Sequence, residues 1–156
     1  MAPVSGMISF KAPDLTQHPP RSPRTRLGGY VHLPRLLDKA RAHLAGKMGE
    51  YNWNCPLDQR FFAFAGVTAD ALLAAVKAGR SDAEMLEWLA TNQQPARAAW
   101  EIAAWSQWLE GFAPGDATRH QTFADHIKAM GPKRDDIRTM FDRLELDDYV
   151  SFGGAA

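Results

Sequence analysis

Cysteine and long hydrophobic runs are scarce in this sequence, and their scarcity excludes whole classes of protein. Cys55 is the only cysteine among 156 residues, so no intramolecular disulfide and no multi-cysteine zinc site can form. No stretch approaches the ~20 apolar residues that cross a bilayer, and the first residues lack the apolar run of a signal peptide. We therefore expect a soluble, cytoplasmic protein with no membrane partner.

An excess of charge of one sign is also missing. Lysine and arginine number 18, aspartate and glutamate number 18, and the formal net charge is zero. Nucleic-acid binding normally needs a net basic surface that neutralises phosphates, so we expect no nucleic-acid partner. The balance is uneven along the chain, because residues 1–78 carry an excess of five basic side chains and residues 79–156 an excess of five acidic ones. We expect these halves to attract each other within the fold or across a dimer.

The remaining composition is ordinary, with 46% hydrophobic and 23% charged residues, close to the averages for globular proteins. The chain is about one domain long and can bury one hydrophobic core. Residues 1–29 are the exception, because they are rich in proline and arginine, and proline blocks helix formation. We predict an extended arm over residues 1–29, whose first residues lack a fixed order, followed by a helical domain over residues 30–156.

Sustained strand alternation is absent, and apolar residues instead recur every three to four positions, which is typical of amphipathic helices. This spacing predicts an all-α, single-domain bundle of about six or seven short helices. They are expected at about 34–46, 57–65, 69–78, from 82, 95–110, 118–130 and around 137–144, with a short extended piece at 149–152. On the first helix, Arg35, Asp38 and Arg41 are spaced three apart and indicate an exposed charge ladder.

The fifth predicted helix is apolar on two sides. One stripe holds Ala98, Ile102, Trp105 and Leu109, and a second, nearly opposite, holds Trp100, Ala104 and Trp108. Such a helix is typically buried between neighbours, although it can also bury one face against another subunit or form the wall of a ligand pocket. Indole rings also stack on flat or sugar-like ligands. Trp100, Trp105 and Trp108 are therefore candidate ligand-binding residues.

Cys55 directly precedes the second predicted helix, where the positive end of the helix dipole favours a reactive thiolate. A nucleophilic cysteine also needs a positioned base, and no histidine lies near it in the sequence. A buried structural thiol is the simpler interpretation. The five histidines form no ligand motif with one another or with acidic residues, and His126 fits the edge of the core. We expect no metal and no cofactor.

Three arginines, Arg21, Arg24 and Arg26, lie close together in the arm. Guanidinium groups suit phosphate and carboxylate ligands, so this cluster is a candidate anion-binding site. Alternatively, these side chains pin the arm to the acidic second half of the chain, in particular to the tail around Asp147 and Asp148. We expect that acidic tail to be exposed.

Three segments carry a resemblance to a known family. Residues 20–24 read PRSPR, residues 27–41 read LGGYVHLPRLLDKAR, and residues 54–59 read NCPLDQ. On these motifs the chain resembles a bacterial family of short proteins catalogued as a domain of unknown function, so the resemblance implies no activity. Because it is densest around the arm and the loop before Cys55, it suggests where a site would lie. The candidate residues there are Tyr30, His32, Glu50, Tyr51, Cys55 and Asp58.

These observations leave three functions open. The leading hypothesis is a binding or interaction protein that takes a small molecule or a protein partner, because the fifth helix is aromatic on two faces and no complete catalytic motif is present. The second is an enzyme that uses Cys55 or His32 in the polar cluster of residues 30–58. The third is a structural or regulatory subunit, and the protein is expected to be a monomer or a homodimer.

Overall fold

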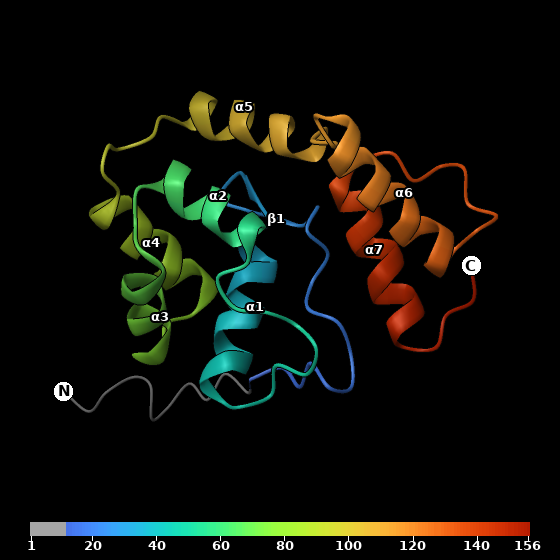
Figure 1. The fold of residues 1–156 in the computed structure, drawn as a ribbon. Coiled ribbons are helices and arrows are strands. Elements are labelled where there is room, and N and C mark those ends of the chain that lie inside the picture. The colour runs from blue at the N-terminus through green and yellow to red at the C-terminus, as the bar shows by residue number, and fades with distance from the viewer. Residues whose placement is uncertain (1–11) are drawn as a thin grey trace.

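The computed structural model describes residues 12–156, which form seven helices and one short hairpin (Figure 1). The elements are β1 (Arg26–Leu27), β2 (Tyr30–Val31), α1 (Leu33–Leu44), α2 (Pro56–Ala65), α3 (Ala69–Lys77), α4 (Asp82–Asn92), α5 (Ala99–Glu110), α6 (Ala117–Met130) and α7 (Met140–Ser151). The predicted all-α bundle is confirmed. No single helix in the described part of the chain is long and apolar enough to span a membrane. The prediction that the arm's first residues lack order falls on residues 1–11, outside the described part.

Local sequence signals explain where most helices begin and end. The Thr68 side chain accepts a hydrogen bond from the free amide of Ala71, and Ser81 and Glu84 form a reciprocal capping box. Gly66 ends α2 in the left-handed conformation that a side chain disfavours. Three boundaries differ from the predictions: α5 begins at Ala99 rather than at Pro95, α7 begins at Met140 and so excludes Ile137, and α7 continues through residues 149–151, which were predicted to be extended.

The hairpin is an element that the helical periodicity did not predict. Leu27 pairs with Tyr30 across a two-residue turn made by Gly28 and Gly29, both at positive φ. A Cβ atom on Gly28 would lie 2.5 Å from the Leu86 side chain, so a larger residue would have to displace Leu86 and would also strain the backbone at this positive φ. Ser106 of α5 fixes the hairpin, because its hydroxyl donates to the Gly29 carbonyl and accepts from the Val31 amide. The Gly28–Gly29 pair was the one feature of the sequence that is typical of a β-hairpin turn.

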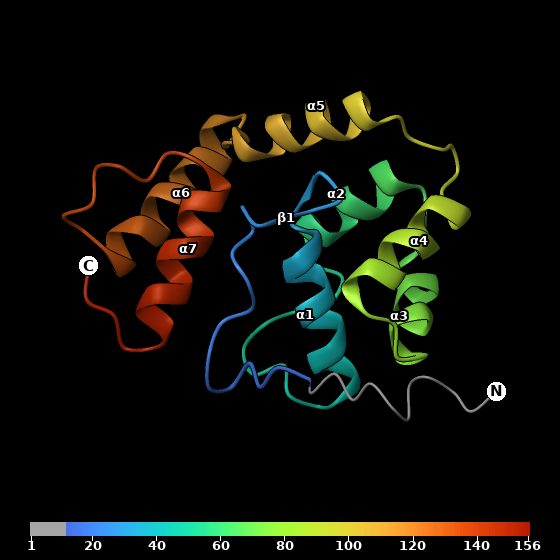
Figure 2. The same cartoon turned by 180° about the vertical axis from the view of Figure 1, so that it is seen from behind.

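The main core lies between α1, α2, α3 and α4, with α1 at its centre (Figure 2). Its buried side chains are Tyr30, Leu33, Leu36, Leu37, Ala40, Phe61, Phe62, Ala65, Leu72, Ala75, Val76, Met85 and Leu89. A smaller cluster of Val31, Leu109 and Phe141 joins β2 and α5 to α7. Helices α6 and α7 pack on each other and form the end of the molecule opposite α3 and α4 (Figure 1).

Helix α5 lies on the outside of the molecule, where it runs from α4 towards α6 (Figure 1). Its inner stripe packs as expected, and the Trp105 ring stacks on Phe64 with centroids 5.0 Å apart. Its outer stripe is uncovered, since Trp100 is 73% exposed and Trp108 is 52% exposed. The prediction of a helix buried between neighbours is therefore wrong, because β2 and α2 cover only one of its two apolar faces.

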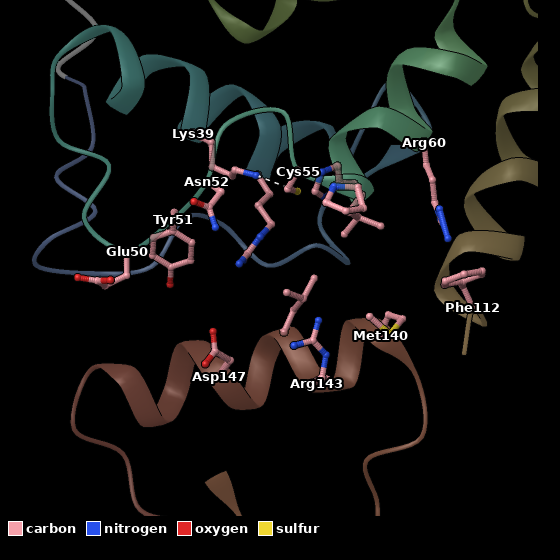
Figure 3. A pocket seen from close by; sticks show the side chains of 15 residues that line it. Lys39, Glu50, Tyr51, Asn52, Cys55, Arg60, Phe112, Met140, Arg143 and Asp147 are labelled. Atoms are coloured by element: carbon pink, nitrogen blue, oxygen red, sulfur yellow. Dashed lines mark hydrogen bonds between the residues drawn. The ribbon is translucent and has the colours of Figure 1, made fainter. Parts of the chain in front are cut away.

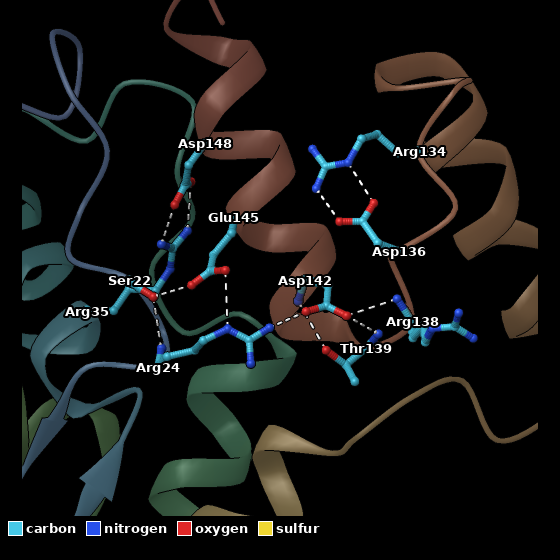
Figure 4. A network of polar contacts seen from close by, with 10 residues as sticks. All are labelled: Ser22, Arg24, Arg35, Arg134, Asp136, Arg138, Thr139, Asp142, Glu145 and Asp148. Atoms are coloured by element: carbon cyan, nitrogen blue, oxygen red, sulfur yellow. Dashed lines mark hydrogen bonds and ion pairs between the residues drawn. The ribbon is translucent and has the colours of Figure 1, made fainter. Parts of the chain in front are cut away.

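The arm is held by its arginines, all of which contact carboxylates. Arg24 pairs with Asp142 and Glu145 of α7, as Figure 4 shows, and Arg26 pairs with Glu110 of α5. These contacts agree with an arm pinned to the acidic half of the chain. Arg21 also contacts the acidic half, through Asp82 of α4, and it contacts Asp38 of α1 in the first half.

Two predictions about exposed charges are wrong. The acidic run near the C-terminus belongs to α7, and Asp148 is buried there against Arg35 rather than against the arm. Arg35 itself is only 3% exposed, and Arg41 pairs with Asp82, so α1 carries no exposed charge ladder. The physical reason is the same in both cases: the polar side of α1 faces other elements of the fold instead of water.

Candidate functional site

A pocket of about 330 Å³ lies between the start of α2 and the facing side of α7 (Figure 3). One wall comes from α1, the loop before α2 and α2 itself, and the other comes from α7 with Phe112 at one end. Its lining residues are His32, Arg35, Lys39, Glu50, Tyr51, Asn52, Cys55, Pro56, Leu57, Arg60, Phe112, Met140, Arg143, Leu144 and Asp147. The pocket therefore joins a region early in the sequence to one near its end.

The structure brings four of the six residues suggested by the family motifs into this pocket: His32, Glu50, Tyr51 and Cys55 line it. Asp58 lies directly behind the wall, fully buried. Tyr30 lies elsewhere, in the main core, where Gln93 donates a hydrogen bond to its hydroxyl and burial raises its pKa.

The three tryptophans of α5 do not line the pocket. Trp105 belongs to the core, whereas Trp100 and Trp108 face outward. The two regions that the sequence suggested as ligand sites are thus separate. Of these two regions, the polar one lines the pocket described above.

A buried group of charges supports the wall around Cys55. The Lys39 ammonium donates to Asp58 Oδ2 at 2.7 Å, and His32 Nε2 lies 2.8 Å from Asp58 Oδ1. Burial by itself raises the pKa of Asp58, but the hydrogen bond from His32 and the charge of Lys39 outweigh burial and lower it. The Lys39 ammonium also lies 3.4 Å from Cys55 Sγ. Cys55 is thus a half-buried thiol beside a cation, whereas the sequence favoured a buried one.

His32 is neutral in this arrangement. Burial lowers its pKa, and the contact with Asp58 opposes burial only in part. The charge of Asp58 is already matched by Lys39, so a protonated His32 would add an unbalanced positive charge to a buried site. The remaining ring proton lies on Nε2, where Asp58 accepts it, and Nδ1 keeps a lone pair. Nδ1 is buried and has no hydrogen-bond partner among residues 12–156.

A second buried pair joins the two walls of the pocket. The Arg35 guanidinium contacts both carboxylate oxygens of Asp148 on α7, at 2.7 and 3.1 Å, as Figure 4 shows. The Tyr51 hydroxyl donates to the same carboxylate at 2.7 Å. Burial, together with this carboxylate, raises the pKa of Tyr51. Arg35 and Asp148 are therefore structural charges that satisfy each other.

Two other cations in the pocket have no carboxylate partner among the described residues. Arg60 lies over the Phe112 ring, 4.3 Å from its centroid, and makes no ion pair. The Arg143 guanidinium makes its one hydrogen bond within residues 12–156 to His126, at 3.5 Å, and burial lowers its pKa despite the nearby charge of Asp147. These two guanidinium groups are available to a ligand, unlike Arg35 and Lys39.

Two carboxylates in the pocket are likewise unpaired within residues 12–156. Glu50 is exposed in the loop after α1, and Asp147 lies on α7, one helical turn from Arg143. The structure gives neither group an ion-pair partner. The pocket therefore presents two free positive and two free negative groups.

The site does not resemble a metal centre. No three His, Cys, Asp or Glu side chains within residues 12–156 are grouped so that they could hold an ion together. His126, expected at the edge of the core, is exposed on α6. The charges of Lys39 and Asp58 are already paired with each other.

Sequence reasoning missed the cations that matter most here. Lys39, Arg60 and Arg143 come from three different helices, and each resembles an ordinary surface residue of an amphipathic helix. The spacing of Arg35 and Lys39, one helical turn apart, placed them on one face but did not show that α7 would cover it. Only the packing of α7 against α1 reveals the pocket.

The family comparison agrees with the motifs noted in the sequence. The domain of unknown function DUF5069 matches residues 17–150, which include both walls of the pocket and exclude only the chain ends. A search of curated proteins found no match. The chain belongs to the DUF5069 family of domains of unknown function.

Proposed function

We propose that this protein binds a small organic anion in the pocket between α2 and α7. The observation that carries the proposal is a pair of guanidinium groups, Arg60 and Arg143, which have no ion-pair partner within residues 12–156 and line one cavity from opposite walls. Guanidinium groups bind carboxylate and phosphate through parallel N–H donors. An anion held between them would also bridge the two walls.

The environment of each guanidinium supports this role. The Phe112 ring covers one face of Arg60, which holds the group in place while its N–H edge stays free. Burial makes the charged form of Arg143 costly, as its lowered pKa indicates, and a bound anion would offset that cost. Leu57, Met140 and Leu144 supply the apolar lining that an organic ligand needs.

His32 adds a second, independent polar feature. Its Nδ1 is a buried acceptor without a partner in the described structure, although buried polar groups are generally hydrogen-bonded. His32 is also one of the lining residues of the pocket. A ligand hydroxyl or amide that donates to Nδ1 would satisfy it, so the ligand is expected to carry a donor besides its anionic group.

Paired probes test the proposal. Caproate and benzoate should raise the melting temperature of the protein, whereas caproamide and benzamide, which have the same shape without the charge, should not. In the R60Q/R143Q variant the difference between acid and amide should disappear, and it should persist in R119Q, where an arginine that is 78% exposed is changed. Equal responses to acids and amides in the native protein would refute the proposal.

A second candidate function, catalysis, is favoured by one contact. The Lys39 ammonium lies 3.4 Å from Cys55 Sγ, in a wall that faces the pocket, and a thiol held in a cavity beside a charged group can act as a nucleophile. An acyl group of a bound ester could then transfer to sulfur: the S–C bond forms, the C–O bond breaks, and the thiol proton leaves with the alcohol.

The rate of alkylation measures the reactivity of the Cys55 thiol directly, because Cys55 is the only cysteine. If Lys39 activates the thiol, iodoacetamide should label native Cys55 faster than it labels a free cysteine peptide, and the K39Q variant should lose the advantage. K77Q, an exposed lysine at the end of α3, serves as the control. A native rate below that of the peptide would count against cysteine catalysis but leave anion binding untouched.

A further inference from the structure

The free charges of the pocket are separated by sign along its length. A neighbouring hollow of about 280 Å³ shares Glu50, Tyr51 and Asp147 with the pocket. Arg60 and Phe112 line the pocket but not the neighbouring hollow, so they lie away from this shared border. Figure 3 shows the same order, with Glu50 at one end and Arg60 and Phe112 at the other.

Helix α7 gives a scale for this separation. Asp147, Arg143 and Met140 line the pocket in that order along the helix, from the shared border towards Phe112 (Figure 3). Four residues of α-helix span about 6 Å, so the backbone positions of Asp147 and Arg143 are separated by about the length of a short aliphatic chain. Arg60 extends the basic end further on the opposite wall.

The charges at both ends are free, whereas those between them are paired. Arg35 is bound to Asp148 and Lys39 to Asp58, so the middle of the wall is electrically satisfied. Within residues 12–156, the two carboxylates at one end and the two guanidinium groups at the other have no ion-pair partner. Any ligand that spans the pocket therefore meets an acidic field at one end and a basic field at the other.

We infer that the ligand is a zwitterion with the plan of an amino acid: its carboxylate lies between Arg60 and Arg143, and its protonated amine lies at Glu50 and Asp147. This inference rests on the proposed anion site and specifies the ligand class for it. The same carboxylates repel a second acid group, so the pocket also discriminates against dicarboxylates. The apolar side chains Leu57 and Leu144 contact the chain between the two charges.

The experiment compares ligands of equal length that differ only in the group at one end. Binding of β-alanine, γ-aminobutyrate and ε-aminocaproate is measured by calorimetry against propionate, butyrate and caproate, with adipate as the dicarboxylate. Partly exposed ion pairs predict that the best amino acid binds about threefold to tenfold more tightly than its matched acid. Adipate should bind more weakly than caproate.

Two double variants separate the zwitterion inference from the proposed anion site on which it rests. E50Q/D147N should bind the amino acid and the matched acid equally, with the affinity for the acid unchanged or higher. R60Q/R143Q should lose both. If the native protein binds caproate but gains nothing from the amine at any length, the zwitterion inference is refuted and the anion site stands. If it binds none of the acids or amino acids, both fail.

Discussion

The two walls of the pocket are built by different forces. The wall formed by α1 and α2 is part of a large apolar core and contains the fully buried Phe61 and Asp58. The α7 wall has the small cluster around Phe141, but its remaining ties to the first half are mainly charged contacts to Arg24 and Arg35. The contact between α7 and the first half of the chain, which we call the seam, is thus the weaker one, and a ligand bound there as proposed would stabilise it.

The largest expected effect on stability is in the wall formed by α1 and α2, which we call the rigid wall. Asp58→Asn removes the carboxylate that balances Lys39 and leaves a buried ammonium unpaired, which costs about 3–5 kcal/mol. Urea unfolding measures the free energy of unfolding. The control is D135N, which changes an exposed aspartate in the loop before α7 and should shift stability by less than about 0.5 kcal/mol. A D58N variant as stable as D135N would show that the buried group is not structural.

A smaller effect is expected at the seam. Asp148→Asn removes a charged hydrogen-bond acceptor from Arg35 and Tyr51, a loss of about 2–3 kcal/mol. Because these contacts tie α7 to the first half, hydrogen exchange should accelerate in residues 140–151 more than in residues 33–44. Equal acceleration in both segments would show that α7 is integrated into the core as firmly as α1 is.

Acid should loosen the rigid wall through His32 before it protonates the carboxylates. The pKa of His32 is lowered by burial below its ordinary value of 6.5, so the unfolded chain binds the proton more readily. The contribution of neutral His32 is complete above pH 6.5 and is lost as the pH falls from there towards the folded pKa. One proton limits the slope to about 1.4 kcal/mol per pH unit.

Urea unfolding at a series of pH values from 8 to 5 measures this slope. His32→Gln should flatten it, whereas H120Q, a change of an exposed histidine, should keep it. Asp58, whose pKa is also lowered, adds a further loss only below its ordinary value of 3.8. A native protein with constant stability from pH 6.5 to pH 5 would contradict a neutral, buried His32.

The helices could be predicted from the sequence because their signals are local. Ser81 with Glu84, Thr68 and Gly66 mark helix ends by chemistry that acts within one turn. The hairpin was missed because its strands are only two residues long, too short for alternation to show. Its Gly28–Gly29 turn was visible, but nothing local indicated that Ser106 would complete it.

The site was only half predictable, for a physical reason. The residues around Cys55 lie close together in the sequence, so the motif pointed to one wall of the pocket. The other wall depends on Arg143 and Asp147, more than 80 residues away, and their position follows from long-range ion pairs such as Arg35 with Asp148. A charged side chain on a helix is the same pattern whether it meets water or a distant carboxylate, so periodicity alone could not distinguish the two.

Weakening the arm should produce a still smaller change. Arg24→Gln removes half-exposed ion pairs to Asp142 and Glu145, which contribute about 0–1 kcal/mol. Added salt screens the same contacts, so the stability difference between native and R24Q protein should shrink as salt is raised. A difference that is constant with salt would indicate that Arg24 acts through packing instead of charge.

The smallest expected effect on stability is on the outer face of α5, where Trp100 and Trp108 are exposed. Trp100→Ala changes a side chain that is 73% exposed, so the free energy of unfolding should change by less than about 0.5 kcal/mol. Trp105→Ala, on the inner face of the same helix, provides the contrast and should cost about 3 kcal/mol, because Trp105 stacks on Phe64. Sedimentation of native and W100A protein over a range of concentrations then tests whether the outer face binds a second copy. If native protein associates and W100A does not, the exposed indoles serve an interface; if both sediment as monomers, this face has no role in self-association.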